Sequence, residues 1–203
     1  MIFTDPPYKL VGGGRKNSLL RDKRENTPFS TSGECFEVKT PEFKEWIPKL
    51  YRILKDSRYL FIMTNDRNMR EIWDLCEESG FIFCELLVMN KHKGVPSSYF
   101  YKSCEYILMF RKGAYRKFNV FGKKTVFEVD MPRGKEKYHP TDKPVDMIQD
   151  IISSVTFENE LIFDPFVGGG STMIASKNLN RKYIGFELDK KYFEIAKNRI
   201  ESR

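Results

Sequence analysis

Four consecutive residues near the start of the chain, Asp5-Pro6-Pro7-Tyr8, combine groups that suit chemistry on an aromatic amine. The carboxylate of Asp5 and the backbone carbonyl of Pro6 can accept the two N–H hydrogens of an exocyclic amine, which leaves the nitrogen lone pair free to react. The prolines fix the backbone and leave a carbonyl with no competing N–H. The ring of Tyr8 offers a face on which a base can stack. A proline-stiffened turn with an ordinary aspartate cap is the alternative interpretation.

A second segment, residues 164–172, has the sequence Asp-Pro-Phe-Val-Gly-Gly-Gly-Ser-Thr and joins a short apolar strand to a predicted helix. Glycines there allow the backbone to approach a ligand closely, and the start of the helix adds unpaired N–H donors. Glu187 stands 23 residues beyond Asp164, at the end of the next predicted strand. An acid in that place can accept both ribose hydroxyls of a nucleoside cofactor. Taken alone, such a turn is typical of nucleotide-binding folds and of plain tight turns alike.

The elements that must position these segments alternate between strands and helices. Short apolar runs predict strands, and apolar residues at helical spacing predict helices. The predicted strands are 2–4, 59–63, 81–88, 106–110, 161–163 and 183–186, and the predicted helices are 41–54, 68–78, 144–155, 171–178 and about 190–200. Thr40-Pro41-Glu42 predicts the N-cap of the first helix, with Pro41 as its first helical residue, and Pro48 is expected to kink that helix. The alternation indicates an α/β fold with a mostly parallel sheet covered by helices on both faces.

Composition and charge describe an ordinary globular chain that suits a polyanionic partner. The 203 residues are 40% hydrophobic and 31% charged, with a net charge of +7 and a pI near 9.1. Basic residues concentrate in residues 9–24 and 111–138. The aromatic residues of the second stretch are Tyr115, Phe118, Phe121 and Tyr138. Rings and cations together favour a nucleic-acid contact over two solvated basic loops, which is the alternative on charge alone.

The sequence carries no signal for export or for a membrane. No apolar run approaches the length of a membrane span, the first residues lack the pattern of a signal peptide, and the four cysteines form no CxxC pair. We therefore expect a cytoplasmic protein with free thiols and without a bound metal.

The motifs together resemble one family, the amino-group DNA methyltransferases that modify adenine at N6 or cytosine at N4. The matching segments are Asp5–Tyr8, Asp164–Gly170 and, between them, His139-Pro140-Thr141-Asp142-Lys143-Pro144. Residues 181–187 and 192–200 also follow the family pattern, so the resemblance spans nearly the whole chain. A catalytic motif that precedes the cofactor motif is similar to the class called beta. The order argues against a dinucleotide dehydrogenase, whose glycine-rich turn would lie near the start.

The resemblance implies a Rossmann-like methyltransferase fold that uses S-adenosylmethionine, with double-stranded DNA as the partner and the target base flipped out. It implies catalytic roles for Asp5, Pro6, Pro7 and Tyr8. The residues that it assigns to cofactor binding are Asp164, Phe166, Gly168, Gly170, Thr172, Glu187, His139 and Lys143. His139, Thr141 and Lys143 would lie beside the methionine end of the cofactor, with Lys143 near its carboxylate. An ordinary loop histidine and a solvated lysine are the alternatives.

The expected activity is site-specific methylation of DNA, of the kind found in restriction–modification systems. Asp5 favours adenine N6 over cytosine N4, because the cytosine enzymes of the family more often carry Ser at that place. The resemblance disfavours RNA as the substrate. The alternative from another class is a catalytically silent DNA-binding relative that kept the fold. The intact Asp5, Gly168 and Glu187 argue against it, because a silent relative has no physical need of them.

We expect a single methyltransferase domain over residues 1–203, with a mobile loop at about 9–38 and a short basic target-recognition insertion at about 111–138. The family usually has another strand and helix before the catalytic motif, whereas Met1 stands four residues before Asp5. Without that strand, residues 183–186 would lie at an open sheet edge, a position that natural proteins cover or charge. A homodimer or another partner is one expected explanation; a shortened chain or an internal start is the other.

Overall fold

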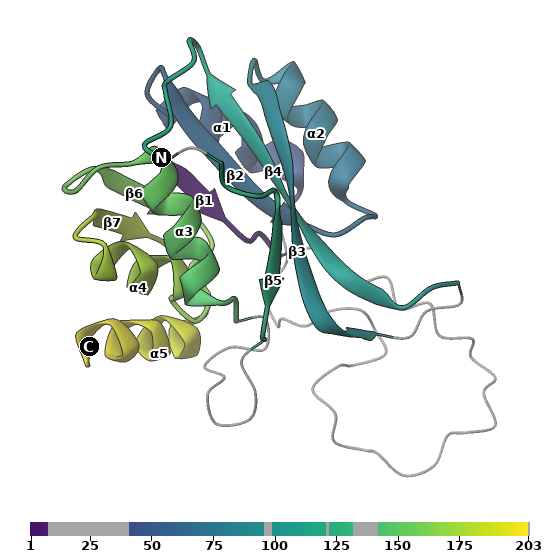
Figure 1. Ribbon diagram of the computed structural model, residues 1–203. Helices are drawn as coiled ribbons and strands as arrows, with labels where there is room; N and C mark the ends of the chain where they lie inside the picture. Colours follow the sequence, from purple (N-terminus) through teal and green to yellow (C-terminus); the bar gives the residue numbers. More distant parts are fainter. Residues whose placement is uncertain (8–40, 96–98, 121, 132–141, 203) are drawn as a thin grey trace.

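A computed structural model describes residues 1–7, 41–95, 99–120, 122–131 and 142–202 of the chain (Figure 1). Its strands are β1 (Ile2–Thr4), β2 (Arg58–Thr64), β3 (Ile82–Val95), β4 (Lys102–Lys112), β5 (Val126–Val129), β6 (Leu161–Asp164) and β7 (Lys182–Gly185). Its helices are α1 (Phe43–Ile53), α2 (Met69–Glu78), α3 (Val145–Val155), α4 (Ser171–Asn178) and α5 (Lys190–Glu201). The predicted alternation of strands and helices is confirmed.

The strands form one sheet in the order β5-β3-β4-β2-β1-β6-β7. The central strand β1 pairs in parallel with β2 and β6, β7 extends the sheet in parallel beyond β6, and β4 runs antiparallel to β2 and β3. Parallel strands end at the same edge of a sheet, so the residues after β1, β6 and β7 come together there. Because β4 is antiparallel to β2, its first residues lie at this edge as well.

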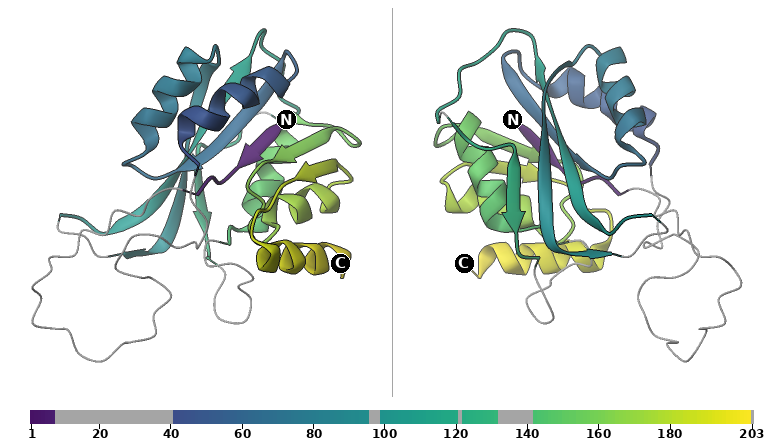
Figure 2. Two further views of the ribbon diagram at one scale, coloured as in Figure 1. Left: turned by 180° about the vertical axis from the view of Figure 1, so that it is seen from behind. Right: turned by 45° about the vertical axis from the view of Figure 1, so that its right-hand side comes forward.

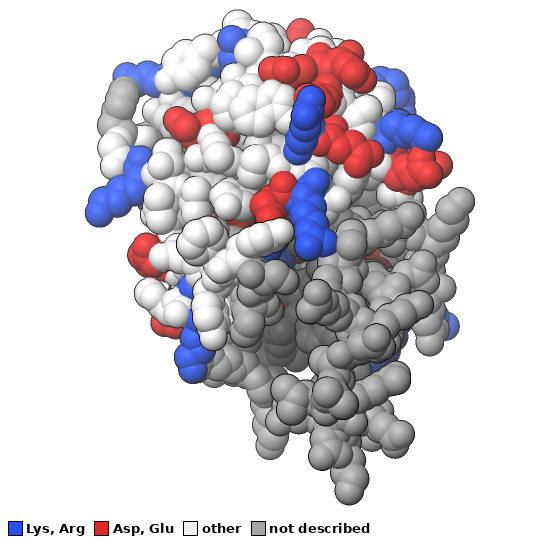
Figure 3. Space-filling view, turned by 90° about the vertical axis from the view of Figure 1, so that its right-hand side faces the viewer, with Lys and Arg blue, Asp and Glu red and all other residues white. Residues whose placement is uncertain are grey.

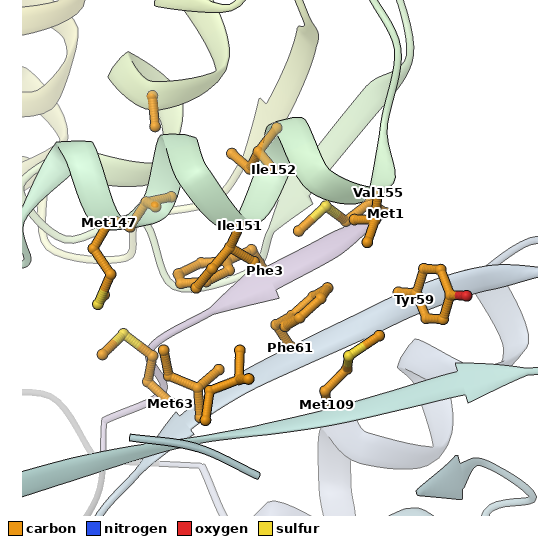
Figure 4. Packing of buried hydrophobic residues seen from close by; sticks show 14 of the residues in the cluster. Met1, Phe3, Tyr59, Phe61, Met63, Met109, Met147, Ile151, Ile152 and Val155 are labelled. Atoms are coloured by element: carbon orange, nitrogen blue, oxygen red, sulfur yellow. The ribbon is translucent and has the colours of Figure 1, made fainter. Parts of the chain in front are cut away.

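Helices cover both faces of the sheet, with α1 and α2 on one face and α3 and α4 on the other (Figures 1 and 2). Neighbouring residues of the central strands point to opposite faces: Ile2 packs with the α1 and α2 side, and Phe3 with the α3 side. Figure 4 shows Phe3 and Phe61 facing Ile151 of α3. Both faces of β1 and β2 are therefore buried, and strands that are buried on both faces have continuous apolar sequences. The buried sheet gives the residues at its carboxyl edge a rigid base.

The first helix begins later than predicted. Its N-cap is Glu42, and a capping box links Glu42 with Glu45, so Pro41 precedes the helix instead of opening it. Thr40 lies outside the described residues. Pro48 lies inside α1 as predicted, and the helix continues through it to Ile53.

The basic stretch 111–138 is partly built into the fold. Residues Val126–Val129 form β5, which extends the sheet beside β3. Phe118 packs edge-on against Tyr59, with 5.4 Å between ring centroids. Arg116 pairs with Glu160 at 2.9 Å, and Lys123 pairs with Asp150 at 2.6 Å. Phe118 and these two cations therefore have partners within the protein.

Residues 121 and 132–138 of that stretch and the loop expected at 9–38 lie outside the described residues. On the face shown in Figure 3, the described lysines and arginines lie among aspartates and glutamates. β7 is the last strand of the described sheet, and it exposes Tyr183 and Ile184. The prediction of an open edge at this strand is confirmed for the described residues. No helix among them has the length and apolar character that crossing a membrane would require.

Candidate active site

Asp5 stands where β1 ends at the carboxyl edge of the sheet. Two prolines follow it, and because proline has no backbone N–H, the hydrogen-bond ladder stops there. Pro6 is buried and Pro7 is half-buried, so the backbone around Asp5 is held by packing. Tyr8, the fourth residue of the motif, lies outside the described residues.

The carboxylate of Asp5 binds a lysine from a distant part of the chain. Lys143 Nζ lies 2.8 Å from Asp5 Oδ2 and 3.2 Å from Glu105 Oε2. Glu105, in β4, also accepts a hydrogen bond of 2.9 Å from Lys91 Nζ in β3. Four charges from different elements thus form one row, Lys91–Glu105–Lys143–Asp5, which we call the charge row.

The other oxygen of the Asp5 carboxylate, Oδ1, is buried and has no hydrogen-bond partner among the described residues. A buried carboxylate oxygen without a donor is costly, and such exceptions are frequent where a ligand is bound. Burial raises the pKa of Asp5, Lys143 opposes that rise, and Glu105 adds to it. Burial also acts to raise the pKa of Glu105, but Lys143 and Lys91 outweigh it, so this pKa is lowered. Asp5 is therefore the acid of the row that is harder to ionise.

Asp164 joins the two predicted motifs directly. Its side chain is buried, and its Oδ1 accepts hydrogen bonds from the Thr4 hydroxyl at 2.8 Å and from the Phe166 backbone N–H at 3.0 Å. Burial raises the pKa of Asp164 to about 6, against the hydrogen bonds from Phe166, Thr172 and Thr4, while nearby Asp5 adds to the rise. The Asp164 carboxylate thus braces the glycine-rich turn against the end of β1.

The glycine-rich turn leads from β6 into α4 as predicted. Gly168 and Gly170 have φ angles of 52° and 86°, which favour glycine, and Gly170 is the N-cap of α4. Glu187 follows β7 and is half-buried. Its Oε2 accepts a hydrogen bond of 2.8 Å from Gly168 N–H, and its Oε1 accepts one of 2.9 Å from Asp189 N–H. The structure therefore brings Glu187 and the turn together, with both carboxylate oxygens oriented.

Three other residues predicted for cofactor binding, Phe166, Thr172 and Lys143, contact side chains of the protein. Phe166 packs edge-on against Trp46 of α1, with 5.2 Å between ring centroids. Thr172 is buried in the first turn of α4 and donates to Asp164. Lys143 lies against Asp5 and Glu105 in the charge row. His139 lies outside the described residues.

Sequence reasoning missed several residues that complete this region. Glu105 and Lys91 were not singled out, although an acid directly before the apolar run of β4 is a usable signal. Asp142, beside Lys143, pairs with buried Arg199 of α5 at 3.2 Å, and Arg199 also donates to the Gly169 carbonyl at 2.8 Å. This contact ties the Lys143 segment to the glycine-rich turn. Among the described residues, no group of three or more His, Cys, Asp or Glu side chains could hold a metal ion.

The fold and the site define an α/β protein in which an acidic motif and a glycine-rich turn meet at the carboxyl ends of adjacent parallel strands. A family model described as DNA methylase matches residues 1–126 and 119–198. The chain belongs to this DNA methylase family.

Individual relatives agree with this assignment. The chain is 32% identical over 224 residues to the type II methyltransferase M2.DpnII of Streptococcus pneumoniae, covering 100% of this chain and 82% of the relative. It is 32% identical over 222 residues to the type II methyltransferase M2.LlaDCHI of Lactococcus lactis subsp. cremoris, covering 98% and 81%. Among solved structures, the M1.HpyAVI–SAM complex superimposes with a TM-score of 0.73 at 27% identity, covering 98% of this chain and 87% of that one.

Proposed function

We propose that this protein transfers a methyl group from S-adenosylmethionine to the N6 amine of adenine in double-stranded DNA, with the target base flipped out. Asp5 carries the proposal, because its buried Oδ1 lacks a donor among the described residues at the catalytic end of β1. Membership of the DNA methylase family and the similarity to type II methyltransferases support it. A DNA methyltransferase of this kind acts on cellular DNA, and we include a cytoplasmic location in the proposal.

The target amine is a poor nucleophile because its lone pair is delocalised into the purine ring. Asp5 Oδ1 accepts one N–H hydrogen of the amine, and the carbonyl of Pro6 accepts the other. The nitrogen then moves towards tetrahedral geometry, and its lone pair points at the methyl group. As the N–C bond forms, the bond between the methyl group and the donor sulfur breaks, and its electron pair stays on the sulfur as a neutral thioether. The nitrogen becomes cationic and releases one proton to the Asp5 carboxylate, which passes it to solvent.

The residues at the ends of β6 and β7 fit a nucleoside cofactor. Glu187 presents an oriented carboxylate that suits the two ribose hydroxyls, and the turn at Gly168–Gly170 gives close backbone approach. The cofactor, when bound, supplies an activated methyl group on a sulfonium, so the protein mainly positions the reactants. Asp164 stabilises the shape of the turn through the hydrogen bonds that it accepts from Thr4 and Phe166.

The test is incubation of the purified protein with S-adenosylmethionine carrying a labelled methyl group and unmethylated duplex DNA, followed by nucleoside analysis. Labelled N6-methyladenine is the expected product. Labelled N4-methylcytosine would instead assign the protein to the cytosine branch of its family. Absence of label in DNA, with cofactor binding retained, would identify a silent DNA-binding relative. An RNA duplex of the same sequence serves as the control for the class of nucleic acid.

A further inference from the structure

The charge row at the end of β1 assigns Lys143 a role that differs from the one its motif predicts. We infer that Lys143, supported by Glu105 and Lys91, is a positioning residue. It holds Asp5 Oδ2 so that Oδ1 points at the target amine, and it keeps the Asp5 carboxyl group ionised. This inference rests on the proposed amine-methylating function of Asp5. The resemblance instead places Lys143 at the carboxylate of the cofactor, and the two roles give different measurable results.

All four members of the row are shielded from water. The side chains of Lys143, Asp5, Glu105 and Lys91 are only 7%, 18%, 18% and 16% exposed. At such burial an ion pair is screened far less than at the surface, and removing one partner leaves a buried charge uncompensated. Two cations face two anions, so the intact row is neutral. The loss of Lys143 would leave Glu105 with Lys91 and Asp5 without the cation that contacts it.

The fold explains why these side chains meet. Glu105 stands one residue before Tyr106, the register partner of Thr64 at the end of β2, so it lies at the carboxyl edge beside Asp5. Met89 is the register partner of Glu105, and Lys91 is two residues further on the same face of β3. The segment before α3 brings Lys143 to the same place. Lys143 thus bridges Asp5 to a carboxylate that belongs to the sheet.

A carboxylate held through one oxygen has the direction of its other oxygen set as well. The contact of 2.8 Å between Lys143 Nζ and Asp5 Oδ2 fixes the rotation of the group, and Oδ1 remains the acceptor. Lys143 also offsets the burial of Asp5 and the like charge of Glu105, both of which favour the protonated acid. A protonated Asp5 would present a weaker acceptor to the amine. Orientation and ionisation of Asp5 therefore both depend on Lys143.

The other charges around Asp5 act in a known direction. Asp164 lies at the end of the neighbouring strand β6, and the charge of Asp5 adds to the rise in the pKa of Asp164. Glu105 raises the pKa of Asp5 from β4, with Lys91 behind it on β3. Among the described residues, Lys143 is the cation that contacts Asp5 directly. The acid limb of the pH–rate profile is thus expected to respond to Lys143 first.

The first experiment compares wild type with Lys143→Met, which keeps the length of the side chain and removes its charge. We expect kcat at pH 7 to fall about 100-fold or more, and the acid limb of kcat to move up by about one to three pH units. The dissociation constant for S-adenosylmethionine, from calorimetric titration, should stay within about threefold. Raising the pH should restore part of the lost rate. Lys44→Met, which removes an exposed cation paired with Glu42, is the matched control.

Two further variants separate positioning from folding. Lys143→Arg restores a cation and should return the acid limb towards wild type. Adding Glu105→Gln to Lys143→Met removes the like charge near Asp5 and should recover about tenfold in kcat, although it removes a second contact. A role in packing alone predicts that the double variant is worse than the single one. Melting temperatures of all variants show whether each remains folded.

The inference is overturned if Lys143→Met keeps the wild-type kcat and pH profile. It is also overturned if this variant binds the cofactor at least tenfold more weakly while kcat at saturating cofactor is preserved, which would place Lys143 at the cofactor. A separate readout covers failure of the proposed function: the pKa of Asp5 from carbon NMR of aspartate-labelled protein without substrate. A higher Asp5 pKa in Lys143→Met, in a protein that methylates no DNA, would keep the charge row and refute the function. An unchanged Asp5 pKa would refute the row itself.

Discussion

Replacing Asp164 by Asn is expected to make the protein more stable at neutral pH. Asp164 is 2% exposed, and burial raises its pKa from an ordinary value of 3.8 to about 6. The folded state then binds its proton more tightly than the unfolded state, so ionisation of Asp164 destabilises the fold. This penalty is fully present above pH 6, declines as the pH falls, and is absent below about pH 3.8.

The size of the effect follows from the two pKa values. The interval between 3.8 and about 6 corresponds to about 3 kcal/mol at roughly 1.4 kcal/mol per pKa unit. Asn has nearly the same shape, and its oxygen can still accept from the Thr4 hydroxyl and the Phe166 N–H. The hydrogen bonds to this side chain will lose some of their geometry, so we expect the free energy of unfolding to rise by a net amount of about 1–3 kcal/mol above pH 6. Near pH 4 the two proteins should be almost equally stable.

The assay is urea unfolding of wild type and Asp164→Asn at several pH values between 4 and 8. The difference in unfolding free energy should grow through the interval from 4 to 6 and then level off. Asp74→Asn, on the exposed side of α2, controls for the general effect of removing a carboxylate. A constant difference across the whole range would show that Asp164 titrates normally, and the reasoning from its burial would be wrong.

Four further perturbations test the site and its surroundings. Asp5→Ala should abolish methyl transfer while cofactor affinity stays within about tenfold, and near-normal turnover would reject its catalytic role. Glu187→Ala should weaken cofactor binding by about 1.5–3 kcal/mol in calorimetric titration, whereas an unchanged constant would make Glu187 a structural acid that only orients its loop. Neutralising exposed Lys124, next to Lys123 and its partner Asp150, should flatten the salt dependence of DNA affinity, and an unaltered slope of log affinity against log salt would remove this position from the DNA interface. Ile184→Lys, at a side chain 50% exposed on the edge strand, should reduce self-association in sedimentation experiments with little change in stability; equal association would show that the β7 edge is not the contact.

Much of the fold could be predicted because it depends on local patterns. Apolar runs bounded by turns marked the central strands, and α2, α3 and α4 begin and end within a few residues of their predicted bounds. The first helix was placed two residues early, because a proline after a threonine suits an N-cap but Glu42 forms a reciprocal cap with Glu45. Two of the three glycines of the turn, Gly168 and Gly170, take positive φ angles, which favour glycine. These features are determined by neighbours in the sequence.

The basic stretch shows what composition leaves undecided. Phe118 and Arg116 lie in a segment whose rings and cations favour a nucleic-acid contact, yet the structure packs Phe118 on Tyr59 and pairs Arg116 with Glu160. Composition records which groups are present and carries no information about which of them find partners inside the fold. Glu160 stands 44 residues beyond Arg116, so no local pattern links them.

By itself, the sequence determined that a carboxylate follows one strand of a parallel sheet and that a glycine-rich turn follows another. Short segments are sufficient for this, because strand ends and positive φ angles depend on neighbouring residues. Only the tertiary structure decided which charges meet at that edge. The Thr4 hydroxyl donates a hydrogen bond to Asp164, 160 residues away in the sequence, and Lys143 forms an ion pair with Asp5. Such pairings depend on strand order and on the antiparallel return of β4. The strand order and the direction of β4 follow from how helices pack on the two apolar faces of the sheet. That packing involves the whole chain and cannot be read from any short segment of the sequence.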